Sequence, residues 1–570
     1  MVVMSGSEAI VETLIRNEMP YYFGVNSSEF LALTDVIYQN EKVSFISARH
    51  ESNAALMADG YIRVTNKPAP VIGTNGPGVA HMYQATGAAR NHGIPLILLV
   101  PGFARAELQN PFTTTKQLDQ TACYKPITKA QFDVDSVAQI PGAINEAIRI
   151  SMAGRPGPVI VSVVPQVYRE KAEVTILPKA KIDPMHYDAE AVKAAAKILV
   201  NAKRPVLLYH ERIFRYDLYS EARELAELLA TPCIGEYRCS RGIVPEDTVL
   251  GFTGWLSAGA GMTTANLEAF SKADAVLALC CNFDNTSTAK NRPGSEVEKQ
   301  IAIETKRIIQ VDADPCEMSR RYPAEVEVLG NPKASIAALV AEIKRLGMDQ
   351  SLRAERMAEA KKLKDRTNNA IEGWYNKLKN ETPIAYVVVY KALQEILDRD
   401  AIQLHSGGTT NRWGAVMQLA KTPNSVHTDG MWHSLGQTFS MALGMKIAYP
   451  DRQVVNVIGD GSFWLCNASE LETQKRLNLP VVTVILNNNI YGNMYLSQQN
   501  RFGGRIIGTE FDNPNFAELG KVFGFHSERV EKPEEVKPAL MRALNSKRPA
   551  IIDIFTPGTT LPMSSPPVVI

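Results

Sequence analysis

The most constraining feature of the sequence is a glycine–aspartate–glycine turn that is followed, one strand–helix–strand unit later, by a run of asparagines. The apolar run Val454 to Ile458 is typical of a buried strand, and it ends in Gly459-Asp460-Gly461. A second apolar run, Val481 to Leu486, ends in Asn487-Asn488-Asn489. Because a helical pattern separates the two runs, we expect parallel strands that bring a carboxylate and an amide to one edge of a sheet.

The residue types at this edge indicate a magnesium site that faces a phosphate. Aspartate and asparagine oxygens, together with a main-chain carbonyl, suit a Mg²⁺ that keeps water and binds phosphate oxygens. Gly461 and Ser462 would let a phosphate approach the main chain at a helix N-terminus. A Gly-Asp-Gly turn alone is common, whereas its spacing of 27 or 28 residues to the asparagine pair is much more specific. The alternative is a turn aspartate and two strand-end asparagines that bind nothing.

This motif resembles the diphosphate–metal motif of thiamine-diphosphate (ThDP) enzymes of the acetolactate synthase and benzoylformate decarboxylase family. The resemblance implies Asp460 and Asn488 as side-chain ligands of Mg²⁺ and Ile490 as the carbonyl ligand. Asn488 is preferred to Asn487 because family members place the metal asparagine second in the pair, eight residues after a proline, here Pro480. The other residues of the motif implied to bind the cofactor are Gly459, Gly461, Ser462, Tyr491 and Gly492.

Length and composition are those of a multidomain globular protein. At 570 residues the chain is too long for one core and fits three domains. The formal net charge of +1 gives no electrostatic reason to expect nucleic acid or an anionic membrane as a partner. No apolar run is long enough to span a bilayer, and the N-terminus lacks a signal pattern. The seven cysteines lack zinc-binding spacing, so we expect reduced thiols in a cytoplasmic protein.

Strand and helix patterns alternate through three successive regions, which predicts three open α/β domains with parallel sheets. Polar, proline-containing residues from Lys171 to Tyr187 are interpreted as the first linker, and the charged stretch Leu346 to Pro383 as a solvated connecting helix. The tail carries four prolines and is expected to be an extended strap or disordered. The resemblance covers nearly the whole chain and implies a pyrimidine-binding domain at 1–175, a central domain at 188–345, a diphosphate-binding domain at 380–556 and a tail at 557–570.

One carboxylic acid is required beside the cofactor. An acid that shares its proton with a ring nitrogen of the aminopyrimidine lets the cofactor remove its own thiazolium C2 proton. Glu51, in Arg49-His50-Glu51 at the end of a predicted strand, resembles the activating glutamate of the family. The competing interpretation is a helix-start glutamate favoured by the helix dipole.

A second requirement is a large apolar side chain between the two cofactor rings, and Leu435 aligns with that position. The neighbouring Trp432 and His433 depart from the small residues usual in the family, and His433 is a candidate catalytic residue. Upstream, Gly408, Thr409 and Thr410 resemble the loop that contacts the diphosphate and thiazolium. Helix capping is an alternative role for the two threonines.

Candidate substrate-pocket residues come from the first region. The early Phe-Gly-x-Pro-Gly turn of the family is replaced here by a stretch in which Asn26 and Ser28 point into the pocket or serve only the turn. Thr74 stands where benzoylformate decarboxylases carry a catalytic histidine, and with the following Gly-Pro-Gly it looks more like acetolactate synthase. The resemblance implies Thr74 as a cofactor-binding residue. His81 and Gln117 lie in segments that line the site in relatives and are candidate catalytic residues.

The resemblance implies an enzyme that uses ThDP and Mg²⁺ to make or break a C–C bond next to a carbonyl, by 2-oxo acid decarboxylation or acyloin-type carboligation. It also implies a homodimer or homotetramer with sites shared between chains. FAD is not expected, because no glycine turn follows Leu207-Leu208-Tyr209 in the central region. Alternatives are an oxalyl-CoA decarboxylase or 2-hydroxyacyl-CoA lyase-like enzyme, and a non-catalytic binding protein that keeps the fold. A nicotinamide dehydrogenase is disfavoured because Gly73 to Gly78 has the wrong glycine spacing.

Overall fold

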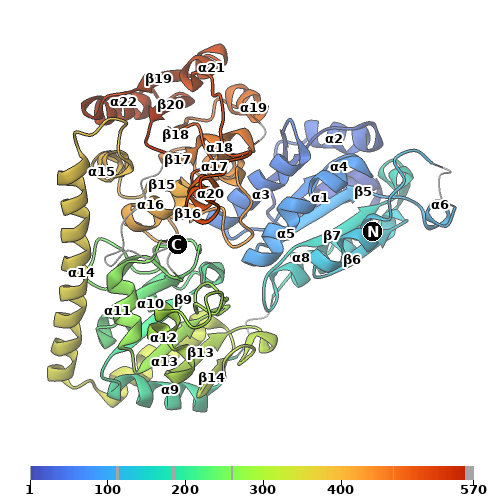
Figure 1. Cartoon of the computed structure of the whole chain (residues 1–570). Helices are drawn as coiled ribbons and strands as arrows, with labels where there is room; N and C mark the ends of the chain where they lie inside the picture. The colour runs from blue at the N-terminus through green and yellow to red at the C-terminus, as the bar shows by residue number, and fades with distance from the viewer. Residues whose placement is uncertain (1, 111–113, 183–185, 259–260, 467, 559–570) are drawn as a thin grey trace. The chain divides into compact units, whose positions relative to one another are not determined.

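Three six-stranded sheets, each entirely parallel, organise the chain in the computed structural model, which describes residues 2–110, 114–182, 186–258, 261–466 and 468–558 (Figure 1). The chain forms two compact units. Unit 1 comprises Met1–Asp183, Phe439–Pro450 and Cys466–Leu479, and unit 2 comprises Pro184–Thr438, Asp451–Leu465 and Pro480–Ile570. The predicted fold class, three α/β layers with parallel sheets, is confirmed. Among the described residues, no helix has both the length and the apolar character needed to cross a membrane.

The first sheet lies in unit 1 and has the strand order β3-β2-β4-β5-β7-β6. Strand β5 is buried along its whole length, as in parallel sheets whose two faces are covered by helices. Sequence patterns predicted every strand of this sheet except β6, in which Gln131 and Asp133 interrupt the apolar run. The strands are β2 Tyr21–Gly24, β3 Ser44–Ser47, β4 Ala69–Ile72, β5 Leu96–Pro101, β6 Gln131–Val134 and β7 Val159–Val163, and the larger helices are α1 Gly6–Arg16, α2 Leu31–Tyr38, α3 Glu51–Thr65, α5 Tyr83–His92 and α8 Ile140–Met152.

The predicted linker from Lys171 to Tyr187 is wrong in its first part. Strand β8, Lys171–Val174, pairs antiparallel with β1, Val2–Ser5, and forms a separate two-stranded ribbon. Lysine and glutamate alternate with Ala172 and Val174 in β8, and this exposed ribbon edge gives a polar composition that resembles a linker.

The second sheet lies in unit 2, with the order β11-β10-β9-β12-β13-β14. Three of its strands, β9, β12 and β13, were predicted from apolar runs, whereas β10 and β11 contain internal glycines that hid them. The strands are β9 Pro205–Tyr209, β10 Cys233–Glu236, β11 Gly251–Leu256, β12 Ala275–Leu279, β13 Arg307–Asp312 and β14 Val326–Leu329; the main helices are α9 Ala189–Asn201, α10 Tyr219–Leu229, α11 Thr264–Ser271, α12 Glu296–Ile301 and α13 Pro332–Leu346.

The third sheet, also in unit 2, has the order β16-β15-β17-β18-β20-β19. Strands β17 and β18 are parallel neighbours in continuous register, from Val454 opposite Val481 to Gly459 opposite Leu486, as the motif predicted. Its strands are β15 Ile402–His405, β16 Val426–Thr428, β17 Val454–Gly459, β18 Val481–Asn487, β19 His526–Val530 and β20 Ala550–Phe555; its helices include α15 Tyr386–Ile396, α16 Thr409–Met417, α18 Asp460–Trp464, α20 Gly492–Arg501, α21 Phe516–Val522 and α22 Pro533–Asn545.

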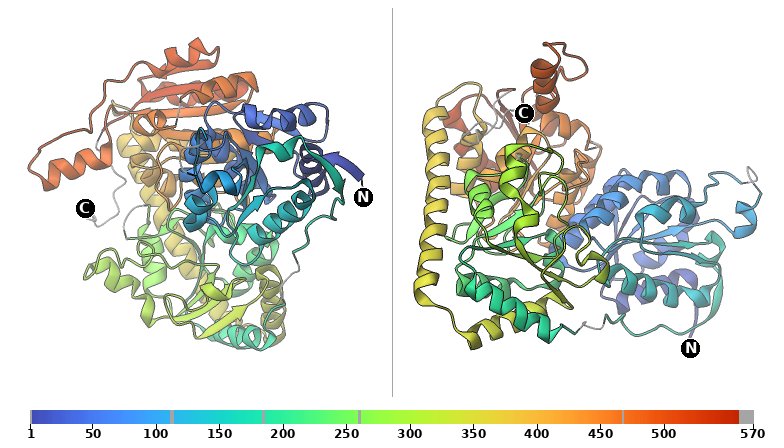
Figure 2. Two further views of the ribbon diagram at one scale, coloured as in Figure 1. Left: turned by 90° about the vertical axis from the view of Figure 1, so that its right-hand side faces the viewer. Right: turned by 60° about the horizontal axis from the view of Figure 1, so that its bottom comes forward.

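Helix α14, Gln350–Leu378, is the charged connecting segment, and it runs from the second sheet to the third along unit 2 (Figures 1 and 2). The prediction of a solvated helix is only half right, because α14 buries two charged side chains, those of Arg356 and Lys364. The ammonium group of Lys364 donates to the carbonyls of Glu246 at 2.6 Å and Gly251 at 2.7 Å. Burial of Lys364 lowers its pKa to about 8, because its charged form is removed from water. The tail from 559 lies outside the described residues.

Two helices from the C-terminal part of the sequence pack within unit 1. Helix α17, Gln437–Ala448, crosses α3 closely, because a Cβ on Gly60 would lie 2.1 Å from the carbonyl oxygen of Met441 and one on Gly444 would lie 1.9 Å from that of Met57. Helix α19, Glu470–Arg476, follows in the same unit. A side chain larger than glycine at position 60 or 444 would force α3 and α17 apart.

Candidate active site

A cavity of about 220 Å³ lies where the loops after β15, β17 and β18 meet in unit 2. Ligands of open α/β sheets bind at this carboxyl edge of the strands. The sequence prediction placed most of its cofactor-binding residues here, and the structure brings them together. Those that line the cavity are Gly408, Thr409, Thr410, His433, Leu435, Gly459, Asp460, Gly461, Ser462, Asn488, Ile490, Tyr491 and Gly492.

Three helices begin at the cavity wall and make it suited to an anion. Helices α16, α18 and α20 start at Thr409, Asp460 and Gly492, so their positive dipole ends and first N–H groups lie at the same cavity. Gly408 has φ = +81°, which favours glycine at the turn into α16. The buried hydroxyl of Thr409 has no hydrogen-bond partner among the described residues. These donors fit a diphosphate group.

Asp460 supplies a buried carboxylate at the start of α18. Its Oδ2 accepts hydrogen bonds from the main-chain N–H of Asn489 at 2.7 Å and of Asn488 at 3.2 Å, and from the Asn513 amide at 2.7 Å. Its Oδ1 accepts one, from Gly461 at 2.9 Å, which leaves room for a cation on that oxygen. Burial raises the pKa of Asp460 to about 6, although the hydrogen bonds oppose this shift. A bound cation would offset the cost of burying this charge.

Asn487 and Asn488, at the end of β18 and directly after it, point to different places. Asn487 ends the strand and turns away from the cavity, where its amide donates to Asp553 at 3.2 Å. Asn488 lines the cavity, with its amide donating to the hydroxyl of Tyr386 at 3.0 Å and its carbonyl oxygen accepting from the N–H of Ile490 at 3.1 Å. Asn488 is therefore better placed than Asn487 to contact a ligand in this cavity.

Leu435 and His433 also line the cavity, and Leu435 lies beside Gly407. A Cβ on Gly407 would lie 2.5 Å from the Leu435 side chain, so the glycine leaves the space that this leucine fills. His433 adopts φ = +55°, an uncommon conformation for a residue other than glycine, and its ring centroid lies 5.7 Å from that of Tyr237.

Arg238 and Tyr386 also line the cavity, and sequence reasoning missed both. Arg238 comes from the loop after β10 and is buried, with φ = +56°; its guanidinium forms an ion pair with Asp429 at 3.0 Å. Tyr386 begins α15, and its ring is parallel to that of Trp413, with centroids 6.1 Å apart. No motif marks either residue, because each reaches the cavity from a segment distant in sequence.

Glu51 begins α3 in unit 1 and is pressed against the glycine turn after β4. A Cβ on Gly73 would lie 2.6 Å from Glu51 Cγ, and one on Gly78 would lie 2.8 Å from its Oε1, so both glycines make space for the glutamate. The other oxygen, Oε2, lies 2.9 Å from His81 Nδ1. The rings of His81 and His50 stack with centroids 4.6 Å apart, and burial followed by the charge of His81 lowers the pKa of His50.

Glu470 holds the turn that carries Glu51 and was not predicted as a site residue. Its Oε1 accepts hydrogen bonds from the main-chain N–H groups of Arg49 at 2.8 Å and His50 at 3.0 Å, and from the Asn53 amide at 3.3 Å. Glu470 is fully buried, and burial raises the pKa of its carboxyl group. The residue therefore fixes the N-terminus of α3, on which Glu51 lies.

Thr74 is part of a polar cluster in unit 1. Its hydroxyl donates to Glu29 at 3.1 Å and accepts from Lys116 at 2.9 Å, while Lys116 also binds Glu29 at 2.6 Å. Burial opposes ionisation of Glu29, but hydrogen bonds from Lys116 and Ser27 outweigh it and lower the pKa of Glu29 to about 2. The hydroxyl of Thr74 is thus hydrogen-bonded within this cluster. Its predicted contact with the cofactor stays a prediction.

The remaining predicted pocket residues make local contacts. Asn26 accepts from the N–H of Ser27 at 2.9 Å, which is turn chemistry, and Ser28 begins a short 3-10 helix. Gln117 donates to the carbonyl of Glu107 at 2.6 Å, on the loop after β5. The neighbouring Gln120, which was not predicted, accepts from the N–H of Gly76 at 2.7 Å and so holds the glycine turn.

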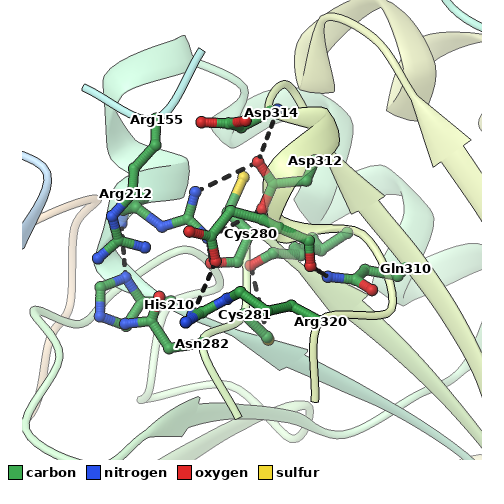
Figure 3. A network of polar contacts seen from close by, with 12 residues as sticks. Arg155, His210, Arg212, Cys280, Cys281, Asn282, Gln310, Asp312, Asp314 and Arg320 are labelled. Atoms are coloured by element: carbon green, nitrogen blue, oxygen red, sulfur yellow. Dashed lines mark hydrogen bonds and ion pairs between the residues drawn. The ribbon is translucent and has the colours of Figure 1, made fainter. Parts of the chain in front are cut away.

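The carboxyl edge of the second sheet is filled by the protein's own side chains (Figure 3). Arg212 follows β9, and its guanidinium binds Asp312 at the end of β13 at 2.9 Å and the carbonyl of Cys280 after β12 at 2.6 Å. Both charged side chains are fully buried. The change of direction in strand order falls between β9 and β12, where doubly wound sheets take nucleotides, and Arg212 lies across this point.

Comparisons with known proteins agree with this arrangement. Three models of the thiamine pyrophosphate enzyme family match in order: the N-terminal TPP binding domain at residues 4–123, the central domain at 192–339 and the C-terminal TPP binding domain at 406–554. The chain belongs to the family of thiamine-diphosphate-dependent enzymes.

Three similar proteins of that family are named acetolactate synthases. A probable acetolactate synthase large subunit of Methanocaldococcus jannaschii is 28% identical, with 99% of this chain and 94% of the relative covered. The acetolactate synthase large subunit of Corynebacterium glutamicum is 27% identical, with 97% and 87% covered. The acetolactate synthase of Bacillus subtilis is 28% identical, with 96% and 92% covered. The predicted family and enzyme class are confirmed.

Proposed function

We propose that the protein is a ThDP- and Mg²⁺-dependent enzyme that decarboxylates a 2-oxo acid and joins its acyl group to a second carbonyl compound, in the manner of an acetolactate synthase. The observation that carries this proposal is the cavity after β15, β17 and β18, where three helix N-termini meet Asp460 and Asn488. Leu435, the candidate for the apolar side chain between the cofactor rings, lines the same cavity. A diphosphate, a cation and an apolar ring contact each have a matching group there.

Each protein group has one task in this proposal. Asp460 and Asn488, with the carbonyl of Ile490, hold Mg²⁺, and the N–H groups of α16, α18 and α20 bind diphosphate oxygens. Leu435 would pack between the two rings of the cofactor. Glu51 holds a proton for the ring nitrogen of the aminopyrimidine. When bound, ThDP supplies a carbon nucleophile that stabilises charge developing on the carbonyl carbon of the substrate.

The substrate assignment is tested with a panel of 2-oxo acids and aldehydes. Purified protein receives ThDP and Mg²⁺, and both CO₂ release and carboligation products are measured, with reactions lacking ThDP as controls. We expect ThDP-dependent CO₂ release together with a hydroxyketone product. Binding of ThDP without turnover of any carbonyl compound would instead support a non-catalytic role.

Purified protein is expected to be colourless. Flavin binding needs an open crevice at the carboxyl edge of the second sheet, and there the buried Arg212–Asp312 pair lies across the strand-order reversal. Absorbance near the flavin bands, read after size-exclusion chromatography, checks this. A flavin spectrum at near-stoichiometric level would contradict the expectation, because Arg212 would then have to move.

We also propose that two chains share each site, in a homodimer or a pair of dimers, as the family resemblance implies. A mixture of Glu51→Gln and Asp460→Ala subunits then gives mixed dimers in which one site carries both defects and the other carries neither. We expect activity to recover partway after subunit exchange, while each variant alone stays inactive. Exchange is verified by mass spectrometry, and a verified mixture that remains inactive would show that both residues act within one chain.

A further inference from the structure

A second cavity, of about 420 Å³, lies on the other edge of the second sheet, in unit 2. Its lining comes from the amino ends of β9 and β10, the end of α11 and the first half of α14. Parallel sheets take their ligands at the carboxyl edge, which in this domain is filled by Arg212. The volume falls in the range of small-molecule sites. This cavity is therefore separate from both sites considered above.

Arg356 of α14 forms the buried part of the cavity wall. Arg356 is only 5% exposed, yet no carboxylate among the described residues forms an ion pair with its guanidinium. Its two Nη atoms donate instead to carbonyls at the C-terminal ends of two helices, including Leu199 and Val200 of α9 at 3.1 Å and Leu229 of α10 at 2.9 Å. The Nε–H has no hydrogen-bond partner within the part of the chain that the structure describes. The helix ends thus hold the cation in place without neutralising it.

The mouth of the cavity adds further positive charge. Lys203 and Arg204 are exposed, and their main-chain N–H groups are fixed by Asp274 at 2.7 and 2.9 Å, while their side chains make no ion pair in the described part of the chain. Lys272 binds Glu268 at 2.6 Å and approaches Glu359 at 3.7 Å. Four cations therefore face only two carboxylates of the lining, which are those of Glu355 and Glu359.

The rest of the lining is apolar. Pro205, Val206 and Pro232 come from the strand ends, and Leu352 and Leu363 come from α14. An apolar floor beneath a positively charged mouth fits a ligand that has a flat apolar body and an anionic head. Arginine and lysine together favour phosphate as that head, because several N–H donors can reach its oxygens.

We propose that this cavity binds a phosphorylated small molecule with an apolar ring, the chemistry of a nucleoside monophosphate. Lys203 and Arg204 bind the phosphate, and the ring packs between Pro205 and Leu352. Arg356 donates its free Nε–H to the ligand from the buried wall. The proposal is independent of the carbonyl chemistry at the other cavity.

Adenosine 5′-monophosphate (AMP) is the probe, titrated calorimetrically into protein that is saturated with ThDP and Mg²⁺. Saturation keeps the probe out of the diphosphate cavity. Lys203→Glu combined with Arg204→Glu is the test variant, because both side chains are exposed and the hydrogen bonds to Asp274 come from the main chain, which the substitutions keep. Lys362→Glu combined with Lys377→Glu is the matched control, since it makes the same charge change on exposed residues of α14 that do not line the cavity.

We expect one AMP site per chain and a Kd that rises at least about 10-fold in the test variant, equivalent to about 1.4 kcal/mol or more, with no change in the control. Higher salt should weaken binding, and adenosine should bind at least about 10-fold more weakly than AMP. Absence of AMP binding at millimolar concentration would overturn the proposal. Equal affinity in the test variant and the wild type, or equal binding of adenosine and AMP, would overturn it as well.

Discussion

Replacement of Asp460 by alanine is expected to abolish Mg²⁺-dependent binding of ThDP. The carboxylate is the charged ligand available to a cation at this end of the cavity, and without it the repulsion of the diphosphate charge is not compensated. The change also leaves the main-chain N–H groups of Asn488 and Asn489 without their acceptor, because both donate to Asp460 Oδ2. Calorimetric titration of ThDP with and without Mg²⁺ measures the effect.

Two further variants separate charge from shape. Asp460→Asn keeps the size of the side chain and removes its charge, so it should also lose most of the Mg²⁺ dependence while its circular dichroism stays native. Asp512→Ala removes an exposed carboxylate two residues after Glu510, the partner of Ile490 in an isolated β-bridge, and should bind ThDP normally. Unchanged ThDP affinity in Asp460→Ala would mean that the metal site lies elsewhere.

Glu51→Gln is expected to retain the fold and cofactor binding and to lower turnover by about 10²-fold or more, a typical loss for a group that transfers protons. Glutamine fills the same space against Gly73 and Gly78, so the packing of α3 is kept. Only the acidic proton is lost. Steady-state kinetics at saturating ThDP and Mg²⁺ measure the change.

The control for this prediction is Glu12→Gln, an exposed glutamate on α1 in the same unit. It makes the same substitution at a residue that was not predicted for the site, and it should leave turnover unchanged. A Glu51→Gln variant with near wild-type kcat would show that Glu51 is not the activating acid. Its role would then be that of a glutamate at the start of α3, where the helix dipole favours a negative charge.

The diphosphate cavity was largely predictable because its residues follow strands that are neighbours in both sequence and space. Apolar runs ending in Gly459 and Asn487 give β17 and β18, and parallel pairing fixes which residues share an edge. The choice of Asn488 over Asn487 rested on family spacing, and the structure orients only Asn488 toward the cavity. Its role as a metal ligand stays a prediction.

Residues that act through tertiary contacts were not predictable. Arg238 reaches the cavity from the second sheet and pairs with Asp429 across 191 positions of sequence, so no local pattern reports it. Glu470 binds the turn before Glu51 from a position more than 400 residues away. The buried Arg356 was interpreted as part of a solvated helix, because charge composition does not show which side chains a helix buries.

Short or polar strands were the main omissions in the fold. Strand β8 alternates charged and small residues, and β10 and β11 contain glycines, so none has the continuous apolar run by which β5 and β12 are recognised. Tertiary pairing, rather than local propensity, forms these strands.

Hydrogen–deuterium exchange at C2 of bound ThDP, followed by NMR, tests most directly whether this chain activates the cofactor. We expect exchange in the wild-type protein to be much faster than in free ThDP, and to slow by about 10²-fold or more in Glu51→Gln. Exchange no faster than in free ThDP, or equal exchange in the wild type and Glu51→Gln, would contradict the assignment of Glu51 as the activating acid.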